Sequence, residues 1–138
     1  MAKYAVSLVI IALNEEAKIA RCIESAKWVD EVIVVDSGST DQTRELAKKL
    51  GARVVVEKWR GFQQQKVFAC GLASHDWILS LDADEALSPE LSSTLKTLCS
   101  GVKTTSAART TSAVLRKPSM PPNLARPARL FACWRAAR

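Results

Sequence analysis

Residues 6–16 read VSLVIIALNEE, and this stretch decides the fold. The nearly continuous run of β-branched and aliphatic side chains over 6–12 is typical of a strand buried on both faces, as in a parallel sheet. Asn14 follows as a predicted N-cap, with acidic residues in the first turn of a predicted helix over 15–26. The stretch therefore predicts a buried parallel strand followed by a helix.

The same alternation of apolar strand and amphipathic helix continues as far as Cys99. Ser88 is placed to cap the last helix, with Pro89 at its first position. A β-α-β-α order implies right-handed crossovers and a parallel sheet covered by helices. We therefore predict an α/β fold, a Rossmann-like half-domain with a parallel sheet. The further strands are predicted over 32–35, 54–56 and 77–81, and the further helices over 43–50, 63–73 and from Ser88 onward.

The pattern stops near Cys99, and the composition changes. Residues 101–138 contain 8 Ala, 6 Arg, 4 Pro, 4 Thr and 3 Ser and no acid, which is typical of a disordered basic tail or linker. Because Ala, Arg and Pro codons are rich in G and C, we favour the alternative that this stretch is an out-of-frame reading of coding DNA. The predicted domains are residues 1–99, the N-terminal part of one domain, and an irregular tail over 100–138.

The net charge of +6 is distributed unevenly along the chain. Residues 1–90 hold 11 Lys and Arg against 14 Asp and Glu, whereas residues 91–138 hold 9 Lys and Arg and no acid. A basic tail suits a module that binds nucleic acid or an anionic membrane. Its only aromatic residues are Phe131 and Trp134, which argues against this alternative, and we expect no specific nucleic-acid partner.

Several classes of protein are excluded by missing motifs. No G-x-G-x-x-G follows the first strand and no G-x-x-x-x-G-K-[ST] occurs, which argues against a dinucleotide dehydrogenase and a P-loop enzyme. The four cysteines show no C-x-x-C spacing, which favours reduced thiols in a cytoplasmic protein. No apolar run approaches the about 20 residues of a membrane helix, so we expect any membrane association to be peripheral.

Carboxylates follow three of the predicted strands, namely Glu15, Asp36 and the pair Asp82 and Asp84. The carboxyl ends of parallel strands share one edge of the sheet, where open α/β sheets bind ligands. An Asp-x-Asp at such an edge suits a hard cation, Mg2+ or Mn2+, which binds through one or two carboxylates plus substrate phosphates. The motif is short, and alone it is more often a charged loop, so its surroundings decide.

Those surroundings resemble a known family. The motifs VIIALNEE (9–16), IVVDSGSTDQT (33–43) and LDADE (81–85) resemble the start of a family 2 glycosyltransferase. The link WRGFQQQKVFA (59–69) is similar to a narrower group, the lipopolysaccharide core-biosynthesis glycosyltransferases. The resemblance covers residues 5–98. It implies a GT-A fold, a nucleoside-diphosphate sugar donor and transfer with inversion at the anomeric carbon.

The resemblance also implies roles for donor-binding residues. Asp36 would accept a hydrogen bond from the base, typically uracil, because an ionised carboxylate can read an imide N–H. Ala12, Asn14 and Glu15 would line the pocket for the base and ribose. The alternatives are structural: Asp36 would cap the turn before the second helix, and Asn14 and Glu15 would be a helix cap and a solvated helix start.

At the diphosphate, Asp84 would ligate the Mg2+ or Mn2+ ion, and Asp82 would lie near the ribose or the metal. The cation would neutralise the leaving group as a Lewis acid. Lys66 matches a basic position that lies near the donor base or phosphates in the family. A solvated helix lysine is an equally weighted alternative for Lys66.

The departures from the family concern the acceptor side. An inverting transferase needs a general base for the acceptor hydroxyl, and in this family the base comes from the second half of the domain. No residue after Glu90 is acidic, so no catalytic base is assigned. The resemblance implies a lipopolysaccharide core or other glycan or lipid-linked acceptor. We expect a cytoplasmic protein, with peripheral contact at the anionic inner face of the plasma membrane. The competing hypothesis is a truncated, catalytically inactive fragment that binds a nucleotide sugar.

Overall fold

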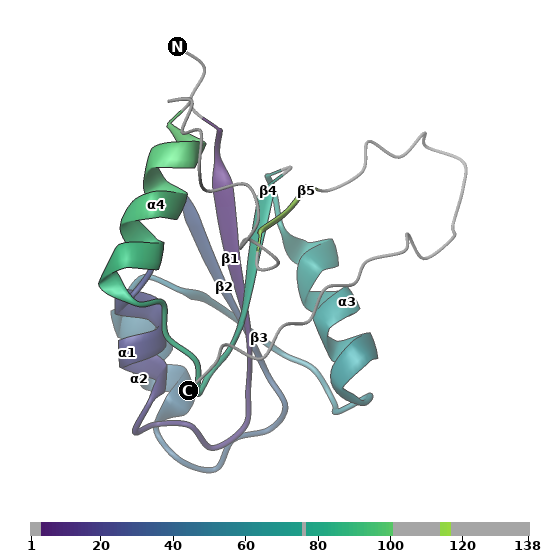
Figure 1. Ribbon diagram of the computed structural model, residues 1–138. Helices are drawn as coiled ribbons and strands as arrows, with labels where there is room; N and C mark the ends of the chain where they lie inside the picture. The colour runs from purple at the N-terminus through teal and green to yellow at the C-terminus, as the bar shows by residue number, and fades with distance from the viewer. Residues whose placement is uncertain (1–3, 76, 101–113, 117–138) are drawn as a thin grey trace, which may run out of the picture.

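The computed structural model describes residues 4–75, 77–100 and 114–116, which form a β-sheet between two layers of helices (Figure 1). The strands are β1 (Val6–Ala12), β2 (Glu31–Asp36), β3 (Arg53–Val56), β4 (Trp77–Asp82) and β5 (Val114–Arg116). The helices are α1 (Ile19–Glu24), α2 (Thr43–Lys49), α3 (Phe62–Leu72) and α4 (Pro89–Cys99). Helices α1, α2 and α4 cover one face of the sheet, and α3 covers the other.

The strand order is β3-β2-β1-β4-β5, with β1 in the centre. Strands β1 to β4 are parallel, and β5 pairs with β4 in the antiparallel sense. Leu8 of β1 lies beside Val32 of β2 on one side and Leu79 of β4 on the other. The predicted α/β fold with a parallel sheet is confirmed.

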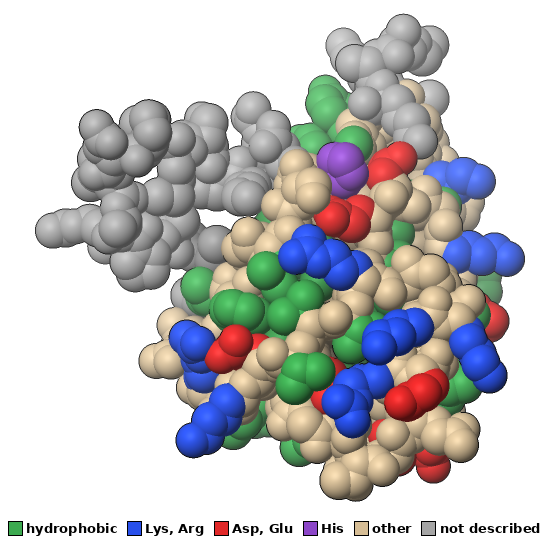
Figure 2. All heavy atoms as spheres, turned by 180° about the vertical axis from the view of Figure 1, so that it is seen from behind, with side chains coloured by type: hydrophobic (Ala, Val, Ile, Leu, Met, Phe, Trp, Pro, Cys, Tyr) green, Lys and Arg blue, Asp and Glu red, His purple; other side chains and the backbone are tan. Residues whose placement is uncertain are grey.

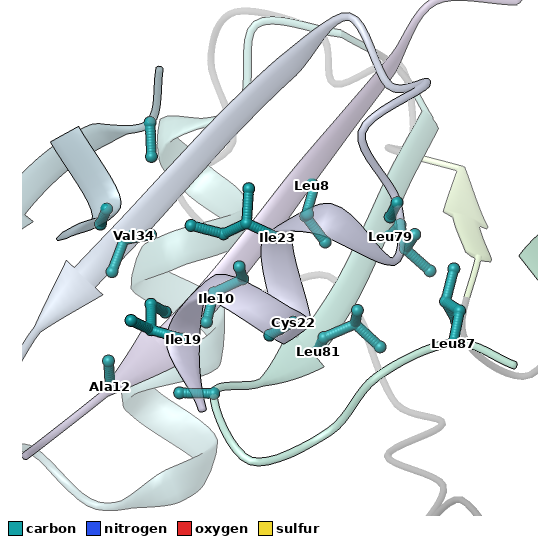
Figure 3. Packing of buried hydrophobic residues seen from close by; sticks show 14 of the residues in the cluster. Leu8, Ile10, Ala12, Ile19, Cys22, Ile23, Val34, Leu79, Leu81 and Leu87 are labelled. Carbon is teal, nitrogen blue, oxygen red and sulfur yellow. The ribbon is translucent and has the colours of Figure 1, made fainter. Parts of the chain in front are cut away.

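Burial of β1 on both faces explains its continuous apolar sequence. Leu8 and Ile10 pack with Ile19 of α1 in the larger hydrophobic core (Figure 3). Val9 points to the opposite face, where the smaller core includes Ala69 of α3. Because its side chains point alternately to the two faces, β1 contributes to both hydrophobic cores. Each fully buried aliphatic side chain of this size stabilises the fold by about 1.5–3 kcal/mol relative to exposure.

The first helix is shorter than predicted. The sequence predicts a helix over 15–26 capped by Asn14, but α1 begins at Ile19 with Lys18 at the N-cap position and no side-chain cap hydrogen bond. The cap prediction is wrong because the Asn14 side chain accepts a hydrogen bond from the Thr40 N–H of a neighbouring loop instead. A contact between distant segments thus replaces the local cap.

The start of α4 agrees with the prediction. The Leu91 N–H donates a hydrogen bond of 3.1 Å to Ser88 Oγ, and Pro89 is the first helical residue. A serine cap satisfies one of the backbone donors that a helix start leaves unpaired.

Most of the predicted irregular tail, 101–113 and 117–138, lies outside the described residues, as does Cys133. The exception is β5, whose three residues pair with the edge of β4. At these residues the structure differs from the predicted irregular tail, because β4 offers a row of backbone groups that a short segment can pair. Cys22, Cys70 and Cys99 are buried and form no disulfide within the described part of the chain.

None of the helices in residues 4–75 and 77–100 combines the length and apolar character that crossing a membrane requires. The longest, α3 and α4, have 11 residues each, whereas a spanning helix needs about 20.

Candidate functional site

The predicted site residues lie at the carboxyl edge of the sheet, where the strand order changes direction. The chain runs outward from β1 through β2 to β3 and then returns to β4 on the other side of β1. Ala12, Asp36 and Asp82 end β1, β2 and β4, and the register places Ala12 beside Asp36 and Ile11 beside Asp82. Open α/β sheets bind ligands at such a switch point, so the tertiary structure brings these residues to one edge, as predicted from the sequence.

The loop after β1 is held by the loop after β2. The Asn14 N–H donates to Ser39 Oγ at 2.8 Å, and Asn14 Oδ1 accepts from the Thr40 N–H at 2.8 Å. The Glu15 N–H donates to Thr43 Oγ1 at 2.9 Å. Asn14 also has a positive φ of 51°, a left-handed conformation that asparagine tolerates better than most residues. The backbone from Ala12 to Glu15 is therefore fixed by contacts between the loops.

Two acidic residues extend this connection toward α2. The Glu16 N–H donates to Asp41 Oδ2 at 3.2 Å, and the Gln42 N–H donates to Glu16 Oε2 at 3.0 Å. The Thr43 hydroxyl and N–H both donate to Asp41 Oδ1, and chiefly the hydroxyl lowers the pKa of Asp41. Asp41 therefore remains ionised at neutral pH. Asp41 and Glu16 together brace the outer part of the two loops.

Asp36 is fully buried, and its carboxylate caps the turn after β2. Its Oδ2 accepts hydrogen bonds from the Gly38 N–H at 2.9 Å and the Ser39 N–H at 2.8 Å. Its Oδ1 accepts a hydrogen bond from the Ser39 hydroxyl. The turn-capping role considered from the sequence is thus present, and it fixes the orientation of the carboxylate at the sheet edge.

Two residues of this edge were not anticipated from the sequence. Arg44 of α2 donates through a guanidinium nitrogen to the Ser39 carbonyl at 3.1 Å, while its Nε lies 3.9 Å from Asp36 Oδ2. Gln65 of α3 is fully buried and donates to Ser37 Oγ at 3.3 Å and to the Glu57 carbonyl at 3.2 Å. The only signal for Gln65 was its helical spacing of four residues from the buried Ala69.

Lys66 and Asp82 meet at the carboxyl edge although they belong to α3 and β4. Lys66 Nζ lies 2.9 Å from Asp82 Oδ1, with 15% and 31% of the two side chains exposed. Asp82 Oδ1 itself is buried and accepts no hydrogen bond within the described part of the chain. The contact is therefore an ion pair at an oxygen that is otherwise available as a ligand. The solvated position considered for Lys66 is not what the structure shows.

The residues after Asp82 form a tight acidic turn over Cys22. The Asp82 N–H donates to Glu85 Oε2 and the Glu85 N–H to the Asp82 carbonyl, both at 2.9 Å, while Asp84 is exposed. Cys22 Sγ lies 3.5 Å from the same carbonyl. Burial, followed by the charges of Glu85, Asp82 and Asp84, raises the pKa of Cys22 to about 12. The thiol thus stays protonated at neutral pH, chiefly because it is buried and in part because the carboxylates of this turn lie nearby.

The family assignment follows from a match over most of the sequence. The family model described as Glycosyl transferase family 2 matches residues 7–124. The chain belongs to glycosyl transferase family 2. The predicted family and its GT-A fold are thereby confirmed. The match includes β5 and runs beyond residue 99, where the composition changes.

Curated relatives match the strand-and-helix part of this family member. An uncharacterised glycosyltransferase of Rickettsia typhi is 55% identical over 87 residues, which cover 62% of this chain and 30% of the relative. The lipopolysaccharide core biosynthesis glycosyltransferase LpsC of Rhizobium meliloti is 43% identical over 94 residues, or 64% and 35% of the two chains. The chain thus spans about a third of the length of these relatives.

Solved structures with the same fold include glucosyl-3-phosphoglycerate synthase from Mycobacterium tuberculosis. Its complex with uridine diphosphate has a TM-score of 0.54 and 36% identity, covering 59% of this family member and 34% of the synthase. Its complex with Mn2+, uridine diphosphate and glucosyl-3-phosphoglycerate has a TM-score of 0.53 and 33% identity, covering 60% and 36%.

Proposed function

We propose that this chain supplies the donor-binding part of an inverting glycosyltransferase that uses a uridine diphosphate sugar. The observation that carries the proposal is the convergence of Asp36, Asp82 and Asp84 at the switch point, beside a β1 loop held in place by the β2 loop. Family membership supports the class of reaction. The synthase of similar fold, in complex with Mn2+ and uridine-diphosphate-glucose, supports this class of donor.

The loops after β1 and β2 are proposed to bind the nucleoside. Asp36 would accept a hydrogen bond from the uracil imide: a carboxylate offers about four lone-pair sites, and the turn uses three of them. Ala12, Asn14 and Glu15 would line the base and ribose pocket. Because hydrogen bonds already order this loop, binding would require little further loss of conformational freedom.

The acidic turn after β4 fits a hard divalent cation, Mg2+ or Mn2+. Asp82 offers a buried oxygen without a hydrogen bond, and Asp84 lies exposed two residues further on. We assign Asp84 as a metal ligand and Asp82 as a ligand or a contact to the ribose. A cation bound there supplies positive charge to the leaving diphosphate. The described residues contain no group of three or more His, Cys, Asp or Glu able to hold a metal, so diphosphate and water oxygens would complete the ligand set.

The proposed division of the chain places donor binding in residues 1–99. Lys66 would contribute a positive charge to the donor diphosphate. The proposed acceptor is a lipopolysaccharide core or a related glycan or lipid-linked acceptor, supported by the 43% identity to the LpsC enzyme over 94 residues. Such an acceptor would place the protein at the inner face of the plasma membrane, in peripheral contact with anionic lipid.

Isothermal titration of the 138-residue chain tests donor binding. UDP-glucose should bind in the presence of Mn2+, bind more weakly after EDTA treatment, and bind more tightly than ADP-glucose. Equal binding of the uracil and adenine nucleotides, or indifference to EDTA, would contradict the proposal. The two nucleotides share the diphosphate and the sugar, so their difference isolates recognition of the base.

Transfer is tested separately with labelled UDP-sugars and a lipopolysaccharide core acceptor. Metal-dependent product that is lost in Asp84→Asn would support an active transferase. Donor binding without product would support the alternative, a catalytically inactive donor-binding fragment.

A further inference from the structure

The ion pair between Lys66 and Asp82 connects two segments that the proposed function assigns to different ligands. Lys66 is proposed to bind the diphosphate, and Asp82 lies beside the proposed cation ligand Asp84. Yet Lys66 Nζ lies 2.9 Å from Asp82 Oδ1. A protein ammonium therefore already supplies positive charge where the cation would bind.

Apart from Lys66, the same oxygen has no polar partner among the described residues. Oδ1 is buried and accepts no hydrogen bond within the described ranges. An ammonium and a divalent cation at the same oxygen repel each other because both are positive. The repulsion is strong at this partly buried carboxylate because water screens the charges only weakly there. The two positive charges should consequently compete for Asp82.

The surroundings of Lys66 let it move without moving the helix. The preceding residue, Gln65, is fully buried and bonded to Ser37 and to the Glu57 carbonyl, so the start of α3 is anchored to the sheet edge. The lysine side chain itself has a flexible four-carbon stem. Exchange of the ammonium between two partners would then use rotation about side-chain bonds while the helix stays in place.

We propose that Lys66 occupies the cation position at Asp82 until the donor arrives, and that the donor diphosphate draws the ammonium away. Lys66 thereby couples donor and cation binding: the diphosphate removes a competitor of the metal, and the metal in turn favours diphosphate binding. Such coupling is reciprocal by thermodynamic necessity. The inference rests on the proposed donor and cation site and adds an exchange of partners by Lys66.

Binding of Mn2+ alone gives the first test, measured by the loss of the electron paramagnetic resonance signal of free Mn2+. Lys66→Met should bind Mn2+ about five-fold more tightly than wild type, the upper range for a partly exposed ion pair. Lys66→Arg retains the charge and should resemble wild type. Lys58→Met removes an exposed lysine from the segment between β3 and α3 and should have no effect. Equal Mn2+ affinity in wild type and Lys66→Met would overturn the inference.

Repeating the Mn2+ titration with saturating UDP gives the second test. UDP should tighten Mn2+ binding more in wild type than in Lys66→Met, by about five-fold on the same basis. Equal tightening in the two proteins would overturn the exchange while leaving the proposed function intact. Failure of wild type to bind UDP with Mn2+ would overturn the proposed function and the exchange of Lys66 onto a diphosphate. The Mn2+-only comparison would still decide whether Lys66 competes with a cation.

Discussion

The two ends of the sheet both carry polar side chains, but they differ in how fully these side chains are satisfied. At the amino end, Glu31 accepts hydrogen bonds from Ser7 Oγ at 2.6 Å and from the Ser74 N–H and Oγ at 3.0 and 2.9 Å. At the carboxyl end, Asp82 Oδ1 and Arg44 Nε are buried without a hydrogen bond in the described part of the chain, and they have only ion-pair partners, Lys66 at 2.9 Å and Asp36 at 3.9 Å. Buried polar groups are normally paired. The satisfied end is thus expected to stabilise the fold, and the unsatisfied end to bind ligands.

Removing a carboxylate from the carboxyl end of the sheet should have the largest effect of the substitutions considered, and the quantity affected should be the affinity for the donor. We expect Asp84→Asn to weaken Mn2+-dependent UDP-glucose binding by about 10- to 100-fold, the range for perturbing a metal site. The thermal unfolding midpoint should not change, because Asp84 is exposed. Titration calorimetry and thermal unfolding measure the two quantities.

Glu85→Gln is the matched control for Asp84→Asn. Its side-chain carbonyl can still accept the hydrogen bond from the Asp82 N–H. Its effect on binding should be much smaller, and equal losses in the two variants would remove Asp84 from its proposed role.

At the satisfied end, removing a carboxylate should instead reduce stability. Glu31→Ala leaves the hydroxyls of Ser7 and Ser74 without their acceptor and should lower the free energy of unfolding by about 2 kcal/mol, within the range for hydrogen bonds to a charged group. UDP-glucose affinity should be unchanged. Urea unfolding measures the loss, with Glu24→Ala on the exposed side of α1 as control. Weaker UDP-glucose binding by Glu31→Ala without a loss of stability would contradict the assignment of the amino end to stability and the carboxyl end to binding.

Ser39 contributes both to the fold and to the candidate site, so its substitution should have a smaller effect on each of two quantities, the free energy of unfolding and the affinity for UDP-glucose. Ser39 accepts the Asn14 N–H and donates to Asp36. Ser39→Ala should therefore cost about 1 kcal/mol of stability and also weaken UDP-glucose binding, because the β1 loop loses its anchor. Ser93→Ala, at an exposed position of α4, is the control. Unchanged donor affinity in Ser39→Ala would show that loop anchoring does not contribute to binding.

The pH dependence of stability tests the smallest effect expected at the amino end of the sheet, the contribution of the ionised Glu31 carboxylate. Burial alone would raise the pKa of Glu31, but hydrogen bonds from Ser7 and Ser74 and the nearby His75 outweigh it and lower the pKa below 4.5. A carboxyl with a lowered folded-state pKa stabilises the protein above its unfolded pKa, and this contribution is lost as the pH falls through the folded pKa.

The unfolding free energies of wild type and Glu31→Gln should therefore differ by a constant amount above about pH 5.5. The difference should shrink as the pH falls below 4.5. Urea unfolding at a series of pH values measures it. A difference that grows on acidification would contradict the assigned direction of the pKa shift.

The alternation of elements and the positions of the strand-end carboxylates could be predicted from local sequence. Strand β1 can be recognised in the sequence because burial on both faces requires a continuous apolar run. Asp36 and Asp82 follow such runs, so their place at one edge follows from the parallel arrangement. The start of α1 could not be predicted in this way, because Asn14 bonds to Thr40, 26 residues away, instead of capping its own helix.

The partners of the site residues were decided only by tertiary structure. Whether Lys66 is a solvated lysine or an ion-pair partner of Asp82 depends on where the chain places β4 after α3. Strand β4 lies beside β1, and this position brings Asp82 to Lys66. Gln65 is buried for the same reason, because α3 crosses to the face and edge where Ser37 lies. Sequence alone thus determined which chemical groups stand at the ends of the strands. The strand order determined which of them meet, because contacts between distant segments depend on the path of the chain and not on local periodicity.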